Sequence, residues 1–491
     1  MKKILSILVA AMLAIPGMAE ISRPKLVVGL VVDQMRWDYL YYFYDQFRPD
    51  GLRRLVDEGY SFENTMINYV PTVTAVGHTS IYTGSVPALH GIAGNDFYLD
   101  GKRVYCCTDA TVQSVGSNSR EGQMSPHNLL ASGLGDVLKI HTDYKAKVVG
   151  VALKDRAAIL PAGHAADAAY WWDTSAGRFV SSTYYMKQLP NWAEQVNKKI
   201  GTKPGTEVKA SPEGVGKTFQ MAEAALVNEG MGQDDITDLL AVSISSTDAV
   251  GHQYGTRHKL TRETYMELDK HLASFFKLLD EKVGRGNYLL FLSADHGAAH
   301  NPNEMKAHKI PAGGVEMKSW LGGVDSRVAQ ELGISGKLIK DENAGRLYLD
   351  HELISRSGKT LDEVKQAVIA EIEKRDEILY VVDYEKVLTT AIPQPIRERI
   401  VNGYNKKRSG DLFYVPKAGW ENVSNKPSYI GTTHGEWNPY DAHIPFILYG
   451  WHVNHGETSE PTNMTDIAPT ICAMLHIQMP NSCVGNAKMM K

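Results

Sequence analysis

The sequence has no excess of charge of either sign and no repeated or low-complexity segment, and both absences exclude whole classes of protein. Its 491 residues carry 52 basic and 56 acidic side chains, which gives a formal net charge of −4. This balance provides no basic surface for a phosphate backbone, so we expect no nucleic-acid binding. Ordinary contents of apolar residues and glycine exclude disordered and fibrous proteins.

A long apolar run is also absent after the first residues. Lys2 and Lys3 precede an apolar run over residues 4–15, and small residues follow it up to Ala19. This pattern is typical of a secretory signal peptide, residues 1–19. Because the run is too short to cross a bilayer, we expect a soluble exported protein, periplasmic or secreted, without a transmembrane anchor. An uncleaved interfacial anchor is the alternative.

Cysteine is scarce as well. The 4 cysteines allow disulfides in an oxidising compartment, in three connectivities that the sequence does not separate. Cys106 and Cys107 are adjacent and therefore difficult to bridge to each other. The pairing that we expect is Cys472 with Cys483, across a short C-terminal loop.

Four apolar runs are typical of strands that are buried on both faces of a parallel sheet. They occupy residues 25–32, 145–153, 238–245 and 286–294, and helical patterns separate them. They predict an α/β protein with a largely parallel central sheet and helices on both faces. In such sheets, ligands bind at the edge formed by the carboxyl ends of the strands.

Carboxylates and imidazoles follow these strand ends. Asp295 and His296 lie side by side where a buried strand stops, and such a pair is suited to zinc, although Asp295 could equally cap the next helix. Asp248 and His252 are four residues apart, so they share one face if a helical turn begins there. The complete set of three carboxylates and three imidazoles, which suits two zinc ions, is Asp33, Asp248, Asp295, His252, His296 and His434.

Thr74 is the candidate nucleophile. Residues 75–82 can form a helix, which leaves Thr74 at or near its N-terminal end. A hydroxyl there faces free backbone N–H groups and the positive end of the helix dipole, which favours an alkoxide or a bound anion. An ordinary threonine N-cap is the alternative. His78, in the same run, is interpreted as structural.

Two cations and an amide are candidates for binding an anion. Lys154 and Arg156 come directly after the strand at residues 145–153, and Asn95 lies in a glycine-containing loop. Arginine binds phosphate oxygens through two parallel hydrogen bonds and lysine binds them as a point charge. A solvated sheet edge is the alternative for the two cations.

The order of these residues resembles that of the alkaline phosphatase superfamily, in the branch with the phosphodiesterases and nucleotide pyrophosphatases. The sequence looks most like the periplasmic phosphate-irrepressible alkaline phosphatases. The resemblance extends from Leu26 to Cys483 and lacks no motif position. It rests on Asn95 and on the segments 31–36, 71–78, 154–156, 247–252, 294–297 and 433–435.

The resemblance implies a role for each candidate residue. One zinc ion would be bound by Asp248, His252 and His434. The other would be bound by Asp33, Thr74, Asp295 and His296. The phosphoryl group would be bound by Asn95, Lys154 and Arg156. Thr74 would attack phosphorus, and water would then hydrolyse the phosphothreonine.

The resemblance also implies an alkaline phosphatase-like domain organisation. We expect a single catalytic domain over residues 20–491, with insertions near 96–130, 161–215 and 298–430. The second of these contains an aromatic stretch, residues 170–185, that we expect to lie over the core. A monomer is favoured.

Charge distinguishes the possible substrates. Two zinc ions are neutralised by three carboxylates and a threonine alkoxide, whereas a phosphate monoester is close to a dianion at neutral pH. Lys154 and Arg156 supply the two missing charges, which favours a broad phosphomonoesterase that acts on small phosphate monoesters and releases inorganic phosphate.

Three alternatives are weaker. A phosphodiesterase or nucleotide pyrophosphatase on the same scaffold is the nearest of them. An exported binding protein that uses zinc only for stability is another, and it predicts closed tetrahedral sites. A sulfatase is disfavoured because no Cys-x-Pro-x-Arg or Ser-x-Pro-x-Arg segment occurs at Thr74.

Overall fold

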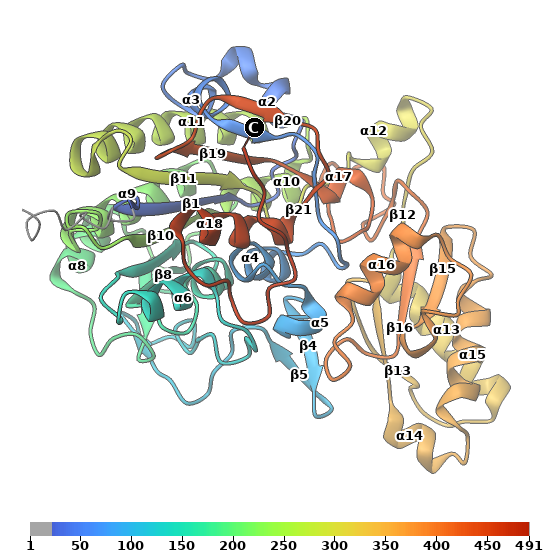
Figure 1. Cartoon of the computed structure of the whole chain (residues 1–491). Coiled ribbons are helices and arrows are strands. Elements are labelled where there is room, and N and C mark those ends of the chain that lie inside the picture. The colour runs from blue at the N-terminus through green and yellow to red at the C-terminus, as the bar shows by residue number, and fades with distance from the viewer. Residues whose placement is uncertain (1–21, 491) are drawn as a thin grey trace, which may run out of the picture.

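The four predicted strands lie next to one another in a sheet of ten strands, which confirms the α/β prediction (Figure 1). The computed structural model describes residues 22–490, so the predicted signal peptide lies outside the described residues. In order across the sheet, the strands are β20 (Gly456–Thr458), β2 (Tyr60–Phe62), β19 (Phe446–Gly450), β11 (Tyr288–Ser293), β1 (Leu26–Val32), β10 (Asp238–Ile244), β7 (Val148–Ala152), β8 (Ala168–Asp173), β9 (Arg178–Ser182) and β6 (Ser114–Val115).

The central strands are parallel and share one register. Val31 of β1 pairs with Ser243 of β10 on one side and with Ser293 of β11 on the other. The three strands therefore end at the same edge, and the residues that follow them meet there. Every residue of these strands is buried, which explains their continuous apolar sequence.

Helices cover both faces of the sheet, as predicted. On one face, α9 (Glu213–Asn228) packs on β10 and against α11 (Lys259–Leu279). On the other face, α7 (Asp155–Ala162) packs on β7 and against α4 (Thr74–Thr83). The last helix, α18 (Ile467–Leu475), also packs on α4. Because α4 lies between other elements, all of its residues are buried.

A second, smaller sheet lies beside the main one. It contains four strands, in the order β13 (Ile339–Asn343), β14 (Arg346–Leu349), β16 (Leu412–Pro416) and β15 (Ile378–Asp383). We call residues 313–421 the inserted subdomain. Figure 1 shows it in yellow and orange, to one side of the main sheet.

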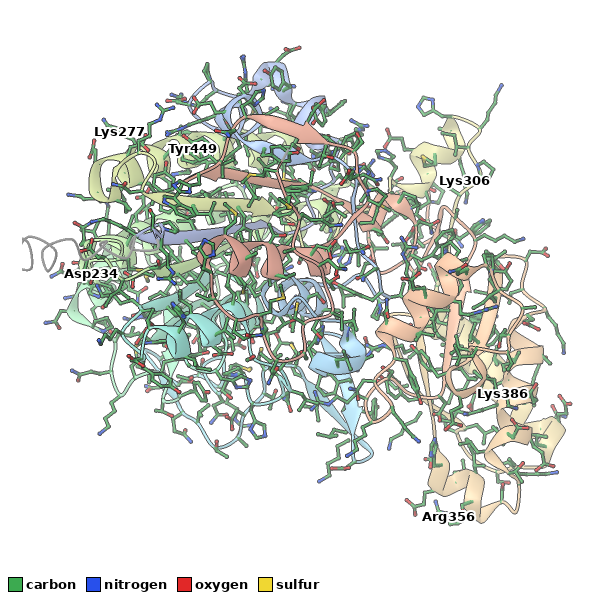
Figure 2. All side chains as sticks on the ribbon, viewed as in Figure 1. Asp234, Lys277, Lys306, Arg356, Lys386 and Tyr449 are labelled. Carbon is green, nitrogen blue, oxygen red and sulfur yellow. The ribbon has the colours of Figure 1, made fainter. Side chains whose placement is uncertain are left out.

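The inserted subdomain has an apolar core of its own. Helices α13 (Met317–Leu332) and α15 (Leu361–Ile372) pack on each other and on the small sheet. Their buried side chains form a cluster separate from that of the main sheet. Figure 2 shows Arg356 and Lys386 on the outer side of this subdomain, away from the main sheet. That it is an insertion within one catalytic domain stays a prediction.

Two expectations about the chain are wrong. The first half of the aromatic stretch does not lie over the core, because β8 pairs in parallel with β7 and extends the main sheet. The disulfide between Cys472 and Cys483 is not formed, and all 4 cysteines are free. Cys472 is buried in α18, and the Cys483 thiol instead faces the carbonyl of Gly485 at 3.8 Å.

No helix within residues 22–490 combines the length and the apolar character that are needed to cross a bilayer. The export that the N-terminal pattern predicts stays a prediction.

Candidate active site

The three central strands deliver the predicted carboxylates to one edge of the sheet. Asp33 follows β1 and Asp295 follows β11, and both are fully buried. After β10 the chain turns into α10 (Ser246–Tyr254), whose first turn carries Asp248 and whose last turn carries His252. The common register of the strands therefore explains why residues far apart in the sequence meet here.

The ligand atoms of these residues lie within coordinating distance of one another. Asp33, Asp295 and His296 form one group whose atoms are all within 4.8 Å, as predicted for one ion. Asp248 and His434 form a second group, which His296 completes. The structure thus brings five of the six predicted carboxylate and imidazole ligands into two groups that share His296.

His252, the sixth predicted ligand, borders the second group. Its Nε2 atom lies 3.1 Å from Asp248 Oδ1 and 3.2 Å from His434 Nε2. The side chain of His252 is 40% exposed, whereas that of His434 is 7% exposed. The site is therefore open to solvent on the side of His252, which a closed structural zinc site would not be.

The three imidazoles are oriented by backbone carbonyls. In each ring Nδ1 lies within hydrogen-bonding distance of a carbonyl oxygen, which leaves Nε2 to face the cluster. The pairs are His252 with Thr432 at 3.0 Å, His296 with Gly297 at 3.0 Å and His434 with Thr72 at 2.7 Å. Burial also lowers the pKa of His296 to about 3, which keeps this imidazole neutral and able to donate a lone pair.

Three buried atoms of the first group have no hydrogen-bond partner among the described residues. They are Asp33 Oδ1, Asp295 Oδ2 and His296 Nε2. An unsatisfied buried polar atom costs about 1–3 kcal/mol, and more where it is charged. Oxygen and imidazole nitrogen donors that converge in this way suit a divalent cation such as zinc, so the residues fit the predicted metal centre.

The carboxyl groups of Asp33 and Asp248 have different pKa values. Burial, reinforced by the charge of Asp295, raises the pKa of Asp33 well above its usual value. Burial would do the same for Asp248, but His252 and Lys154 outweigh it and hold the pKa of Asp248 well below its usual value. The two carboxylates differ in pKa although Lys154 contacts both, at 2.7 Å for Asp33 and 2.5 Å for Asp248.

Thr74 is the first residue of α4 and lies beside this cluster. Lys154 joins the two, because its Nζ lies 3.4 Å from Thr74 Oγ1, 2.7 Å from Asp33 Oδ2 and 2.5 Å from Asp248 Oδ2. Burial would lower the pKa of Lys154, but Asp248 and Asp33 outweigh it and raise that pKa, so the side chain is an ammonium. A full positive charge therefore lies next to the candidate nucleophile.

Asn95 is anchored at the start of α4, and Arg156 is anchored by Tyr105. Asn95 Oδ1 accepts a hydrogen bond from the backbone N–H of Ala75 at 2.9 Å, so its amide group is left to donate. Arg156 Nη1 donates to Tyr105 Oη at 3.2 Å. Tyr105 Oη in turn donates to Asp155 Oδ1 at 2.6 Å.

Gln34 supports the site but has no signal in the sequence. Its Nε2 donates to Asp248 Oδ1 at 2.7 Å, and its backbone N–H donates to Asp295 Oδ1 at 3.1 Å. Its φ is +64°, in the left-handed region that is uncommon for a residue with a side chain. One residue thus holds carboxylates of both predicted metal sites.

Asp441 is a second support that sequence reasoning missed. Its Oδ2 accepts from the backbone N–H groups of Gly435 and Glu436, at 3.0 and 2.8 Å, directly after His434. Its carbonyl accepts from Gly297 N at 2.7 Å, directly after His296. Asp441 therefore ties together the two turns that carry these imidazoles, and only a structure reveals it.

Gly77 allows α4 to approach the strand end at Asp295. A Cβ atom on Gly77 would lie 2.2 Å from the carbonyl oxygen of Asp295. We therefore expect Gly77→Ala to lower the unfolding free energy by about 1–3 kcal/mol. It should also lower kcat/KM for the hydrolysis of phosphate monoesters, the activity expected from the sequence, by about 10²-fold, because a displaced α4 would displace Thr74. Thermal unfolding and steady-state kinetics measure both effects.

Gly322→Ala is the matched control, because a Cβ at this glycine of α13 would meet nothing within 4 Å. It should leave kcat/KM unchanged and stabilise the helix slightly. Wild-type kinetics for Gly77→Ala would show that the close approach of α4 does not position Thr74.

The chain is similar to known proteins over most of its length. Residues 27–437 match the family model for type I phosphodiesterase/nucleotide pyrophosphatase. Alkaline phosphatase PafA of Elizabethkingia meningoseptica is 43% identical, over 98% of this chain and 96% of that protein. Alkaline phosphatase PhoV of Synechococcus elongatus is 41% identical, over 95% of this chain and 92% of that protein.

A solved structure shows the same architecture. The crystal structure of wild-type PafA has a TM-score of 0.90 to this chain at 44% identity, and the match covers 95% of this chain and 98% of that one. The two chains therefore share one fold, in agreement with the fold expected from the sequence.

Proposed function

Because the chain belongs to the type I phosphodiesterase/nucleotide pyrophosphatase family of the alkaline phosphatase superfamily, we propose that it is an alkaline phosphatase. It hydrolyses a broad range of phosphate monoesters through a phosphothreonine intermediate and releases inorganic phosphate. The observation that carries this proposal is the ammonium of Lys154, 3.4 Å from Thr74 Oγ1 and within the metal-ligand cluster. The alkaline phosphatases PafA and PhoV, similar over nearly the whole chain, support it.

Two zinc ions are the proposed cofactors. Asp33, Thr74, Asp295 and His296 would hold one, and Asp248, His252 and His434 would hold the other. Bound there, they would lower the pKa of a hydroxyl or a water and stabilise the oxygens that enter and leave phosphorus. The donor set and the unsatisfied buried atoms support this assignment.

The residues of the chain then perform two displacements. Thr74 Oγ1 loses its proton and forms a bond to phosphorus, while the bond from phosphorus to the ester oxygen breaks and the alcohol leaves with a proton. In the second displacement, water forms a bond to phosphorus and the bond to Thr74 breaks, which releases phosphate and restores the hydroxyl. Asn95, Lys154 and Arg156 hold the nonbridging oxygens through both steps.

The position of the positive charges favours monoesters over diesters. A monoester brings nearly two negative charges to the site and a diester brings one. Lys154 and Arg156 are both buried or nearly so, and a charge in such surroundings acts more strongly than one in water. The loss of both should therefore affect the dianionic substrate more.

The test is the double variant Lys154→Ala with Arg156→Ala. We expect kcat/KM for a phosphate monoester to fall by about 10³-fold, by analogy with other cations that stabilise phosphoryl transfer, and kcat/KM for a diester to fall much less. A panel of monoester and diester substrates measures the difference.

Lys139→Ala provides the control, since Lys139 is also buried but pairs with Asp167 at 2.7 Å, away from the site. It should leave both activities unchanged. Equal losses for monoesters and diesters in the double variant would refute the role of the cations and would favour the alternative, a phosphodiesterase or nucleotide pyrophosphatase. The description of the matching family model is the observation that favours this alternative.

A further inference from the structure

A short hairpin carries one phosphate-binding residue and anchors another. Its strands are β4 (Asp96–Leu99) and β5 (Lys102–Tyr105), and Asn95 directly precedes the first of them. Asp96 pairs with Tyr105, and Cys106 N donates to the carbonyl of Asn95 at 2.9 Å. Asn95 and Tyr105 therefore lie at the same end of the hairpin.

Tyr105 connects this end of the hairpin to the second phosphate-binding residue. Its hydroxyl accepts from Arg156 Nη1 at 3.2 Å and donates to Asp155 Oδ1 at 2.6 Å. A shift of the hairpin would consequently move Asn95 directly and Arg156 through Tyr105. The hairpin thus determines the geometry of two of the three proposed contacts to the phosphoryl group.

A buried arginine of the inserted subdomain binds the backbone at the base of the hairpin, whereas Asp341 binds Tyr98 and Arg103 farther along it, at 3.3 and 3.4 Å. Arg346, the first residue of β14, is fully buried. Its Nη1 donates to the carbonyl of Ala93 at 2.7 Å and its Nη2 to the carbonyl of Asp96 at 3.0 Å. These carbonyls lie on either side of Asn95, so the planar guanidinium fixes the backbone that presents the Asn95 amide.

The remaining donors of Arg346 bind within its own subdomain. Nε donates to the carbonyl of Asn343 at 3.0 Å, and Nη2 also donates to Asn343 Oδ1 at 2.8 Å. No ion pair of Arg346 is found among the described residues, so its charge is compensated by neutral oxygens and by the ring of Tyr348, whose centroid lies 5.9 Å from the guanidinium carbon. Burial of a cation without an ion pair costs desolvation free energy. Two of the hydrogen bonds that offset this cost join the subdomain to the backbone on either side of Asn95.

Gly94 lies directly against the guanidinium of Arg346. A Cβ atom on Gly94 would lie 2.2 Å from Arg346 Nη2, so glycine allows the guanidinium to reach both carbonyls. At the exposed tip of the hairpin, Lys340 Nζ donates to the carbonyl of Gly101 at 2.7 Å. Figure 1 shows the hairpin on the side of the main sheet that faces the inserted subdomain.

We propose that Arg346 is a positioning residue for monoester hydrolysis, through which the inserted subdomain fixes Asn95 and, by way of Tyr105, Arg156. This inference rests on the proposed function, because it requires that Asn95 and Arg156 bind the phosphoryl group. It assigns the inserted subdomain a part in the organisation of the active site, although the subdomain supplies none of the proposed metal ligands or phosphate contacts.

The test compares Arg346→Met with Arg346→Lys in the full chain. We expect Arg346→Met to lower kcat/KM for a monoester by about 10²-fold, the effect of a small misplacement of a binding group, and to weaken inhibition by inorganic phosphate. Arg346→Lys keeps the charge but cannot bond both carbonyls in the same geometry, so its loss should be smaller. In an Asn95→Ala background, Arg346→Met should cost much less than in the wild type.

Amide hydrogen exchange over residues 93–106 measures the support directly, independently of activity. Exchange of Cys106 N–H, which donates to Asn95, should rise in Arg346→Met. Lys365→Met is the matched control, since Lys365 is a buried cation of the same subdomain whose bonds go to Asp383 and Glu385, at 3.0 and 3.1 Å. It should change neither exchange over residues 93–106 nor kcat/KM.

Unchanged exchange in Arg346→Met, or an equal loss of activity with and without Asn95, would overturn the proposal. Wild-type kinetics in Asn95→Ala would instead show that Asn95 does not bind the phosphoryl group, even if Arg346→Met raises exchange. The kinetics of Asn95→Ala therefore test the proposed function, whereas hydrogen exchange in Arg346→Met tests the support by Arg346.

Discussion

Removal of divalent metal ions from the protein is expected to lower kcat/KM for phosphate monoesters by about 10⁴-fold or more. Metal ions supply several kcal/mol of transition-state stabilisation, and each 1.36 kcal/mol corresponds to about tenfold in rate. The cluster contains three buried carboxylates, and Lys154 is the cation that contacts two of them. Chelation followed by addition of Zn²⁺ measures the loss and its recovery.

The folded protein should also be more stable with metal bound. Asp33 Oδ1, Asp295 Oδ2 and His296 Nε2 have no hydrogen-bond partner among the described residues, although Asp295 Oδ2 lies 3.2 Å from His78 Nδ1, and a bound ion would contact all three. A ligand at a thousandfold excess over its Kd adds about 4 kcal/mol to the unfolding free energy. We therefore expect Zn²⁺ to raise the Tm of the chelated protein, and thermal unfolding measures this without any substrate.

A ligand variant separates the two sites. His434→Ala removes a donor from the second group but none from the group of Asp33, Asp295 and His296, so it should lower the metal content from two ions per chain to one. Elemental analysis after equilibrium dialysis measures the content. His351→Ala is the control, because the hydrogen-bond partner of His351 among residues 22–490 is Asp411, at 2.7 Å, in the inserted subdomain. Two retained ions in His434→Ala, or full activity without metal, would contradict the proposed centre.

The central sheet was predictable because its signal is local. Strands buried on both faces must be apolar at every position, so β1, β10 and β11 are visible in the sequence as continuous runs. The edge at which these strands end was also predictable. Parallel strands in one register bring together whatever follows each of them, and here these residues include Asp33 and Asp295.

The supports of the site were not predictable because their signal is entirely spatial. Gln34 and Asp441 are ordinary polar residues in the sequence. Gln34 is distinguished only by its bonds to Asp248 and Asp295. Asp441 is distinguished only by its bonds to the turns that follow His296 and His434. Arg346 is separated from Ala93 by 253 positions. No periodicity or spacing relates two such residues, so a contact of this kind requires coordinates.

The errors about the chain have a similar origin. The aromatic residues of β8 have no alternating pattern, because β8 is buried on both faces in the extended sheet. From sequence alone, a stretch rich in tryptophan and tyrosine could equally be a loop that lies over the core. Its pairing with β7 identifies it as a strand of the main sheet. The pairing of Cys472 with Cys483 rested on short separation alone, and separation in sequence does not orient a side chain that a helix directs into the core.

Thr74→Ala is expected to lower kcat for phosphate monoesters by about 10⁴-fold or more, the order found when a nucleophile is removed from a site whose other groups remain. Lys154, Arg156, Asn95 and the metal ligands would still bind the substrate, so KM should change far less than kcat. Thr74→Ser keeps the hydroxyl at the first position of α4 and should retain most of the activity. Mass spectrometry of acid-quenched wild-type protein should detect a phosphoryl group on Thr74.

Thr83→Ala is the matched control for that experiment. Thr83 is buried at the other end of α4, and its hydroxyl donates to the carbonyl of Thr79 at 2.8 Å, so the variant removes a comparable group from the same helix. It should lower stability by about 1 kcal/mol and leave kcat within a few-fold of the wild type. A phosphorylated intermediate that persists in Thr74→Ala would mean that another residue is the nucleophile. Lys154 Nζ contacts Thr74 Oγ1 as well as Asp33 and Asp248, so loss of the intermediate in Thr74→Ala and its retention in Thr83→Ala would assign the attack to this hydroxyl.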